Sequence, residues 1–285
     1  VNNYIKKLKN DGKTLPISIQ FVAVNNSAVF EFETANAIDA RQKDLVAEHD
    51  ILYKGQIAFK HVSQQRDRPV VALIDSGVSL VNSSMRDFDV FQFYPKTKGL
   101  DLVDTGLGHG TGIISLADGL IGQSDLESPI FLSCVGLPHG KYTFIDTLEC
   151  MNWLFLQPRV DIILNPWLAS SPGCLTEWNY ALQMIWLSNS IPVFSAGNYG
   201  EKSEQSYSPA NLSPFWPIAE TVSVGATSIN QKRLASSSYQ SIDCDRKRPI
   251  ATINALGSGY RVAVPFTENS FQQVDGTSYA IVPIA

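Results

Sequence analysis

Short apolar runs alternate along the middle of the chain with stretches in which apolar residues recur at helical spacing. The apolar runs occupy residues 70–74, 129–135, 160–164, 191–194 and 221–226. The helical spacing is found in residues 111–119, 146–156 and 175–187. An almost wholly apolar run of this length is typical of a strand buried on both faces of a parallel sheet. The alternation therefore predicts right-handed βαβ units, that is, an α/β domain with three α/β/α layers and a mainly parallel central sheet.

The first part of the chain has a different character and is expected to form a small α+β appendage. We interpret residues 16–32 as a pair of strands that turns at Asn25-Asn26, residues 35–48 as a helix, and residues 51–60 as a further strand-like piece. This divides the chain into an N-terminal appendage, residues 1–69, and a main domain, residues 70–285. The appendage could be an inhibitory pro-segment, a module that docks an unknown partner, an edge extension of the main sheet or a plain structural extension.

The composition supports a large core and narrows the possible partners. Of the 285 residues, 44% are hydrophobic, which suits one domain of about 200–250 residues with a smaller appendage. The net charge of −5 argues against nucleic acid or an anionic membrane as the main partner, because both need a basic face. No apolar run approaches the roughly 18–20 residues of a membrane span. The chain begins at Val1 without a leader segment, which leaves open whether the protein is secreted or cytoplasmic.

The cysteines do not form a recognisable framework. They are few for this length and lack the paired spacing of a metal site: Cys134, Cys150, Cys174 and Cys244. We therefore expect ordinary core or surface thiols, with one disulfide as the alternative.

Polar residues follow soon after two of the apolar runs. Asp75 follows residues 70–74 directly, and a carboxylate at the end of a buried strand is costly to place unless a partner compensates it. Ligands bind at this end of the strands in an open α/β sheet. Asn198 follows residues 191–194 after the small residues Ser195-Ala196-Gly197. Each residue alone also fits a turn or a helix cap, so neither identifies a site by itself.

A histidine and a serine occupy segments of small residues. His109 lies in Gly108-His109-Gly110-Thr111, at a predicted helix start, where the glycines let another side chain or a substrate approach closely. Ser278 lies in Gly276-Thr277-Ser278-Tyr279-Ala280, a turn ahead of another possible helix start. The other histidines lack such surroundings and are expected on the surface or in loops: His49, His61 and His139.

In chain order, these segments supply a carboxylate, an imidazole, an amide and a hydroxyl. Together they resemble the four motifs of the subtilisin-like serine proteases, the subtilase family, and the resemblance covers residues 70–285. It implies that Ser278 is the nucleophile, His109 the general base and acid, and Asp75 the carboxylate that orients His109. It also implies that Asn198 and the backbone N–H of Ser278 stabilise the oxyanion. The expected activity is that of a serine endopeptidase, which cleaves protein or peptide substrates through an acyl-enzyme.

The resemblance implies where a substrate would bind. Subtilases usually hold it as an added strand between two edges, one of which corresponds here to Trp167-Leu168-Ala169. Ser195-Ala196-Gly197 are also expected to contact the substrate, which Gly197 lets approach closely. Ala169 stands where the family usually has glycine, and its methyl group is expected to narrow the S1 pocket or shift the added strand. Trp167 is expected either to shape a neighbouring subsite or to pack in the core.

No cofactor is expected, because the chain has no GxGxxG or P-loop pattern and the family resemblance implies none. No metal site is predicted either, since the chain lacks the Asn-rich loop in which many subtilases hold calcium. Asp118, Asp125 and Glu127 could bind calcium weakly, but we interpret them as surface acids.

The C-terminal segment departs from the family pattern. Val282 occupies the place of a family proline, and Pro283 comes one residue later. The helix expected from Ser278 has eight residues up to Ala285, which is marginal by itself, so we expect a further C-terminal piece or another segment to complete it. These departures, with those at 167–169, support an alternative, a weak or inactive subtilase-fold protein that binds peptides. A hydrolase of esters is a third possibility.

Overall fold

The computed structural model describes residues 20–22, 29–31, 68–85, 88–95, 104–105, 108–121, 128–140, 144–170, 176–200, 207–208, 222–243 and 246–285. Its contacts divide the chain into two compact units, Val1–Leu52 and Tyr53–Ala285. Among the helices in the described ranges, none is long and apolar enough to cross a membrane.

The first unit contains a short antiparallel pair of strands, β1 (Gln20–Val22) and β2 (Val29–Glu31). Phe21 pairs with Phe30 at the centre of the register. A strand pair within residues 16–32 is therefore confirmed, whereas the predicted turn at Asn25-Asn26 lies outside the described residues. The helix expected at 35–48 and the strand-like piece expected at 51–60 lie outside the described residues.

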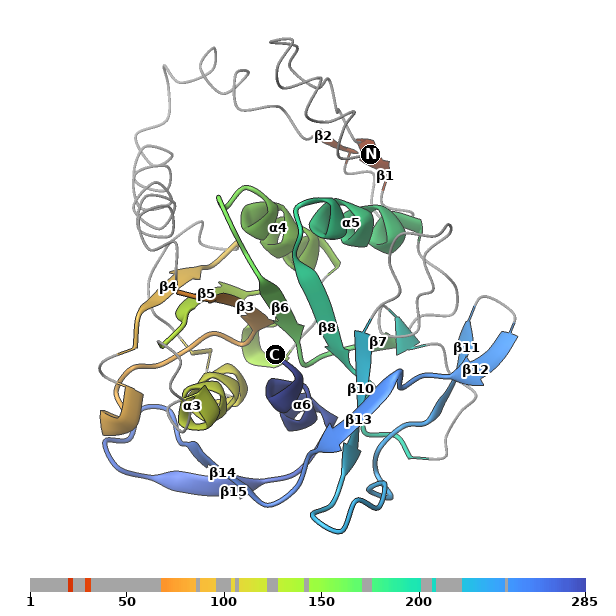
Figure 1. Cartoon of the computed structure of the whole chain (residues 1–285). Coiled ribbons are helices and arrows are strands. Elements are labelled where there is room, and N and C mark those ends of the chain that lie inside the picture. The colour runs from red at the N-terminus through yellow and green to blue at the C-terminus, as the bar shows by residue number, and fades with distance from the viewer. Residues whose placement is uncertain are drawn as a thin grey trace, which may run out of the picture. The chain divides into compact units, whose positions relative to one another are not determined.

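The second unit is built on a seven-stranded sheet in the order β13-β10-β8-β6-β3-β5-β4, in which all neighbours are parallel (Figure 1). Its strands are β3 (Val70–Asp75), β4 (Val90–Phe93), β5 (Ile130–Val135), β6 (Ile162–Asn165), β8 (Ile191–Ser195), β10 (Val222–Thr227) and β13 (Ile253–Leu256). Its helices are α3 (His109–Ile121), α4 (Phe144–Phe155), α5 (Thr176–Leu187) and α6 (Thr277–Ala280). Because α4 and α5 lie on one face of the sheet and α3 and α6 on the other, the predicted α/β/α layering is confirmed (Figure 1).

The central strand β3 contributes to the core on both faces of the sheet. Val70, Ala72 and Ile74 belong to the core under α4 and α5, whereas Val71 and Leu73 belong to the core under α3 and α6. Successive side chains of a strand point to opposite faces, so a strand covered on both sides needs apolar residues at consecutive positions. This is the physical reason for the apolar runs in the sequence.

The two strands that the apolar pattern did not predict are the edge strands, β4 and β13. Each has four residues, and most of their side chains are half-buried or exposed. An edge strand has one neighbour in the sheet and less cover, so it needs no continuous apolar run. The signal on which the prediction rested is therefore absent from these two strands.

Helix α3 begins at His109 and continues to Ile121, past the predicted end at Gly119. Gly119 is exposed, and no neighbouring atom lies within 4 Å of the place where a Cβ would be. A glycine inside a helix costs about 1 kcal/mol relative to alanine. Burial of Ile113 and Ile114 on the sheet side of α3 outweighs that cost, so Gly119 does not end the helix.

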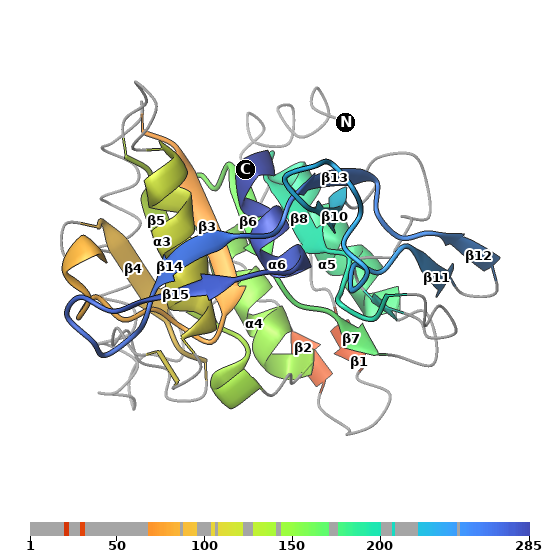
Figure 2. The ribbon, with the colours of Figure 1, turned by 90° about the horizontal axis from the view of Figure 1, so that it is seen from below.

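Small antiparallel pairs of strands and 3₁₀ turns lie outside the main sheet. The pairs are β7 (Ala169–Ser170) with β9 (Tyr207–Ser208), β11 (Gln240–Asp243) with β12 (Arg246–Pro249), and β14 (Tyr260–Ala263) with β15 (Phe271–Val274). The turns are η2 (Ser83–Met85), η3 (Pro138–Gly140) and η4 (Val282–Ile284). The β14–β15 hairpin packs against α3 (Figure 2), where the N–H of Ala263 donates to Oγ of Ser115 at 3.0 Å.

The segment from Ser278 onward is not the eight-residue helix that the sequence predicted. Helix α6 is a single turn, and the 3₁₀ turn η4 follows it with Pro283 in its first positions. Ala280 and Ile281 are fully buried, and α6 packs against β8, β10 and β13. Burial, rather than helix length, therefore holds the backbone around Ser278.

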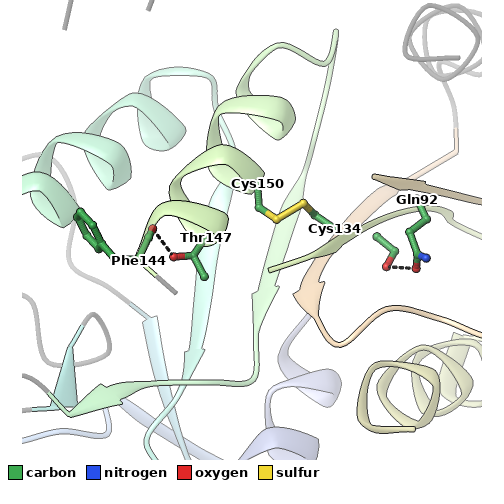
Figure 3. The surroundings of a disulfide bond; sticks show 6 residues. Gln92, Cys134, Phe144, Thr147 and Cys150 are labelled. Atoms are coloured by element: carbon green, nitrogen blue, oxygen red, sulfur yellow. Dashed lines mark hydrogen bonds between the residues drawn. A yellow bond between two sulfur atoms is a disulfide. The ribbon is translucent and has the colours of Figure 1, made fainter. Parts of the chain in front are cut away.

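A disulfide joins Cys134 in β5 to Cys150 in α4 (Figure 3). The expectation of ordinary thiols is therefore wrong for this pair, and the alternative of one disulfide is right. Cys134 points to the face of β5 that α4 covers, which only the three-dimensional arrangement reveals, and both residues are fully buried. Cys174 and Cys244 lie outside the described residues.

Candidate active site

Asp75 is the last residue of β3, at the carboxyl end of the central sheet. The residue is 3% exposed, and its two carboxylate oxygens have separate partners. Oδ1 accepts the backbone N–H of Ser76 at 2.6 Å, and Oδ2 lies 2.8 Å from Nδ1 of His109. The buried carboxylate is thus compensated, as a charge in this position requires.

The first turn of α3 packs directly against the end of β3, and this places His109 beside Asp75. A Cβ on Gly110 would collide with the carbonyl oxygen of Gly77 and lie 3.3 Å from Cβ of Asp75. The N–H of Gly110 donates to Oγ of Ser76 at 3.2 Å. The glycine after the histidine is therefore needed for the close approach of helix and strand.

The environment of His109 favours its charged form. Burial lowers the pKa of the imidazole, but the charge of Asp75, the hydrogen bond to Asp75 and the charge of Asp104 raise it, with a net shift above the usual value. Because Nδ1 faces a carboxylate, the neutral ring carries its proton there, and Nε2 is left as the basic nitrogen. The ring of Tyr279 packs edge-on at 5.7 Å between centroids, and burial, with the charge of Asp75, raises the pKa of that phenol to about 12.

Asn198 follows β8 and is held in one orientation by Thr277. Its Oδ1 accepts the N–H of Thr277 at 3.0 Å and the hydroxyl of Thr277 at 3.1 Å. A backbone N–H can only donate, so the atom facing it must be the amide oxygen. The side-chain NH₂ of Asn198 therefore remains as a donor next to the residue that precedes Ser278.

Ser278 is the second residue of α6 and is 8% exposed. Its hydroxyl donates to the carbonyl oxygen of Pro166 at 3.0 Å. Among the described residues, no hydrogen bond joins this hydroxyl to His109, and none satisfies the backbone N–H of Ser278. The first N–H groups of a helix lack acceptors within the helix, so this N–H is a donor available to a bound group.

The residues expected to bind substrate lie in two adjacent segments, after β6 and at the end of β8. Leu168 is half-buried and touches Gly197, where a Cβ would collide with the leucine side chain. The positive φ of Gly197, 97°, also favours glycine. Ser195 and Ala196 are buried, and Ala169 begins β7. Trp167 is 5% exposed and packs edge-on against Phe194, so the packed alternative describes its position in this structure.

Three contacts at the site were not predicted from the sequence. Asp104 lies beneath the start of α3, Thr277 holds Asn198, and the carbonyl of Pro166 receives the hydroxyl of Ser278. Thr277 and Pro166 adjoin residues that were recognised, so closeness in sequence could have pointed to them. Asp104 comes five residues before His109 and had no such signal.

The residues considered for calcium do not form a described site. Asp118 is half-buried in α3, where burial raises the pKa of its carboxyl, and Asp125 and Glu127 lie outside the described residues. Within the described ranges, no three metal-ligating side chains gather in one place. His139, expected on the surface or in a loop, is exposed in η3.

The protein thus has a three-layer α/β fold. At the carboxyl end of its sheet, His109 is hydrogen-bonded to the carboxylate of Asp75, and Ser278 lies in the first turn of α6. Residues 66–281 match the sequence model of the subtilase family, Peptidase_S8. The chain belongs to the subtilase family of serine proteases. Subtilases need no cofactor for catalysis, and their substrates are proteins or peptides. No curated protein matches the sequence.

Solved structures of subtilisin-like proteases share the fold. A cold-adapted subtilisin-like serine proteinase has 19% identity and a TM-score of 0.59, with 75% of this chain and 71% of that chain covered. The prenylagaramide maturation protease PagA has 20% identity and a TM-score of 0.56, with 79% and 76% covered. A mutant of the protease domain of PatA has 18% identity and a TM-score of 0.56, with 76% of each chain covered.

Proposed function

We propose that this subtilase is a serine endopeptidase in which Asp75, His109 and Ser278 form the catalytic triad. The observation that carries the proposal is the 2.8 Å contact between Asp75 Oδ2 and His109 Nδ1 at the carboxyl end of the sheet. A carboxylate on Nδ1 fixes the tautomer in which Nε2 can take a proton, and it stabilises the imidazolium that results. The raised pKa of His109 supports the same role.

The reaction would follow the usual course of acyl transfer. Oγ of Ser278 bonds to the carbonyl carbon of the scissile peptide as its proton passes to Nε2 of His109. The carbon–nitrogen bond then breaks, and the departing amine takes the proton from the imidazolium. Water, deprotonated by the same nitrogen, attacks the resulting ester. The bond between the carbonyl carbon and Oγ then breaks, and the imidazolium returns its proton to Oγ, which releases the acid and restores Ser278. Before the first step, the Ser278 hydroxyl must leave the carbonyl of Pro166 and turn toward the imidazole.

Two donors would stabilise the oxyanion of the tetrahedral intermediate. One is the side-chain NH₂ of Asn198, whose orientation is set by its bonds to Thr277. The other is the backbone N–H of Ser278 at the start of α6. Donors that are already in place require no reorganisation when charge develops, which is why such sites lower the barrier. We propose residues 167–169 as one edge along which the substrate chain lies and residues 195–197, which contact it at Leu168, as a further part of the substrate-binding site.

One observation favours a second candidate, a peptide-binding protein that turns its ligand over slowly or not at all. The Ser278 hydroxyl is engaged by Pro166 rather than by His109. A hydrogen bond of this kind contributes only about 1 kcal/mol net, so substrate binding can displace it at little cost. A binder would retain the same contact with no need to break it.

Labelling with a fluorophosphonate, read by intact mass, separates the two candidates. We expect one adduct on the wild type, none on Ser278→Ala and strongly slowed labelling of His109→Ala. The matched control is His139→Ala, which removes an exposed imidazole, keeps the backbone N–H that donates to Thr105, and should label like the wild type. A folded wild type that stays unlabelled while it still binds peptides would favour the second candidate. Turnover of a peptide panel, compared with simple esters, distinguishes an endopeptidase from an esterase.

We also propose that residues 1–69 act as an appendage to a catalytic domain of residues 70–285. If the appendage is inhibitory, clean removal should raise kcat/KM sharply. Unchanged kcat/KM after removal would exclude an inhibitory pro-segment and leave docking or a structural role.

A further inference from the structure

A second buried carboxylate lies beneath the start of α3. Asp104 is 2% exposed, yet it lies on neither the sheet nor a helix. Its Oδ1 accepts the N–H of Gly108 at 3.0 Å, and its Oδ2 accepts the hydroxyl of Thr111 at 2.6 Å. Gly108 precedes His109 in the sequence and Thr111 follows it. The side chain of Asp104 therefore forms hydrogen bonds to the start of α3 before and after the histidine.

The segment that carries Asp104 is fastened to the end of β3. The N–H and the hydroxyl of Thr105 both donate to the carbonyl oxygen of Ser76, at 3.0 and 2.9 Å. Ser76 also holds the helix from the other side, because its Oγ accepts the N–H of Gly110 at 3.2 Å. Asp75 and Asp104 thus belong to one hydrogen-bonded assembly. Asp75 binds His109 itself, and the two attachments of Asp104, at Gly108 and Thr111, lie on either side of His109 in the sequence.

Thr111 links Asp104 by hydrogen bonds to the loop that contains Ser79. Its Oγ1 accepts the N–H of Ser79 at 3.0 Å while its own proton goes to Asp104. The direction of the Thr111–Asp104 bond is therefore fixed, since the hydroxyl has a single proton and carboxylate oxygens only accept. An anionic carboxylate at a helix N-terminus is favourable in addition, because the helix dipole places partial positive charge there.

The charged and titratable groups around His109 come from several elements. Asp75 faces it from β3, Asp104 from the segment before α3, and Tyr279 from α6. On the β14–β15 hairpin that packs against α3, the Arg261 guanidinium lies over the ring of Phe271. Asp118 is in the last part of α3, nine residues beyond His109 in the helix. At 1.5 Å per residue this is about 14 Å along the axis, more than one screening length at 0.1 M salt.

We propose that Asp104 is a positioning residue for His109, which fixes the first turn of α3 and places a second negative charge beside the imidazolium that forms during catalysis. Asp104 acts through the helix and through its charge. It does not touch the reacting atoms. Its kinetic consequence rests on the proposed function, whereas its effect on the titration of His109 does not.

The direct test is the titration of the His109 imidazole by NMR in the full chain, with Ser278→Ala present to prevent self-digestion. Asp104→Asn keeps an acceptor for Gly108 and removes the charge, so the midpoint of His109 should move to lower pH. Asp104→Glu keeps the charge and should leave the midpoint near that of the parent. Asp118→Asn is the matched control, a charge removed from the same helix beyond the screening length, and should leave the midpoint unchanged.

Kinetics then test the positioning role. Asp104→Asn should lower the plateau of kcat/KM by about three- to tenfold, the size expected when one partly screened charge is lost. Thr111→Val removes one of the two hydrogen bonds of Asp104 to this segment, together with the acceptor of the Ser79 N–H, and keeps the charge of Asp104. It should lower kcat by about three- to tenfold through misplacement of the imidazole, with KM and the His109 midpoint unchanged.

Two results would overturn the proposal. One is an Asp104→Asn chain that folds and in which the midpoint of the His109 titration equals that of the Ser278→Ala parent or that of Asp118→Asn. The other, which remains available if Asp104→Asn fails to fold, is a Thr111→Val enzyme with unchanged kcat. Failure of the proposed function would look different, because the wild type would hydrolyse no substrate while the titration of His109 still responded to Asp104.

Discussion

The two faces of the central sheet are covered by helices in different ways. On the face of α4 and α5, large side chains fill the core, with Trp153 stacked on Phe93 and Trp167 edge-on against Phe194, and a disulfide joins α4 to β5. Within α4, the hydroxyl of Thr147 donates to the carbonyl oxygen of Phe144 (Figure 3).

On the face of α3 and α6, small residues bring backbones together. Gly110 lies against Gly77, and a Cβ on Gly257 would come within 2.8 Å of the carbonyl oxygen of Gly276. All the candidate catalytic side chains belong to this face or to the strand ends beneath it. Large apolar side chains supply buried area on both faces, but on this face close backbone approach also sets the distances between functional groups. Changes on the two faces should therefore separate stability from activity.

The largest effect is expected on the small-residue face, from the loss of the Asn198 amide. Removing one oxyanion donor typically lowers kcat by about 10²–10³-fold, so Asn198→Ala should do the same with KM little changed. Asn198→Asp is the sharper variant, because it keeps the oxygen that accepts from Thr277 and removes the donor. Steady-state kinetics on a peptide substrate measure both. If Asn198→Asp retained near-normal kcat, Asn198 would be a structural anchor only.

The next effect is expected on the opposite face, in stability. Replacing both Cys134 and Cys150 by alanine should lower the free energy of unfolding by about 3 kcal/mol, the size expected for a loop of this length. Urea denaturation of the Ser278→Ala chain measures it without self-digestion. The folded double variant should still label with fluorophosphonate at the wild-type rate when Ser278 is present. A labelling defect as large as that expected for His109→Ala would show that the two faces are not separable.

Within α3, two glycines provide a matched pair. Gly110→Ala inserts a methyl group against the Gly77 carbonyl and should destabilise the fold by about 1–3 kcal/mol and slow labelling, because the helix must move away from Asp75. Gly119→Ala meets open space in the same helix and should stabilise by up to about 1 kcal/mol with unchanged labelling. Equal effects of the two substitutions on labelling would contradict a role for close approach.

The sequence predicted the parts of this molecule that depend on a repeated or local signal. Five buried strands and three helices were foreseen because a two-sided sheet demands apolar runs. The edge strands β4 and β13 are partly exposed, so they do not need a continuous apolar run, and their sequences do not contain one. Likewise, the pairing of Cys134 with Cys150 follows from the direction in which one β5 side chain points, which composition and spacing do not reveal.

The site shows the same division. Asp75 and His109 lie together as the family resemblance implied, because each belongs to a recognisable segment. The hydrogen bonds of Asp104 to Gly108 and Thr111 were not predicted. They depend on the path of the short segment that carries Asp104 past the start of α3. The sequence motifs also could not indicate that the Ser278 hydroxyl donates to the carbonyl oxygen of Pro166, because the side-chain rotamer of Ser278 decides this.

The smallest expected effect is the dependence of stability on the protonation of His109. Since the pKa of His109 is raised in the folded chain by Asp75 and Asp104 against the opposing effect of burial, the protonated form favours folding. This stabilisation is fully present below the unfolded pKa of about 6.5 and is lost as the pH rises through the folded pKa. The free energy of unfolding of the Ser278→Ala chain, minus that of the same chain with His109→Gln, should therefore be larger at low pH than at high pH. A difference that grew with rising pH would mean that burial outweighs the two carboxylates, and the activity of the enzyme would then extend to more acidic conditions than the two-carboxylate site implies.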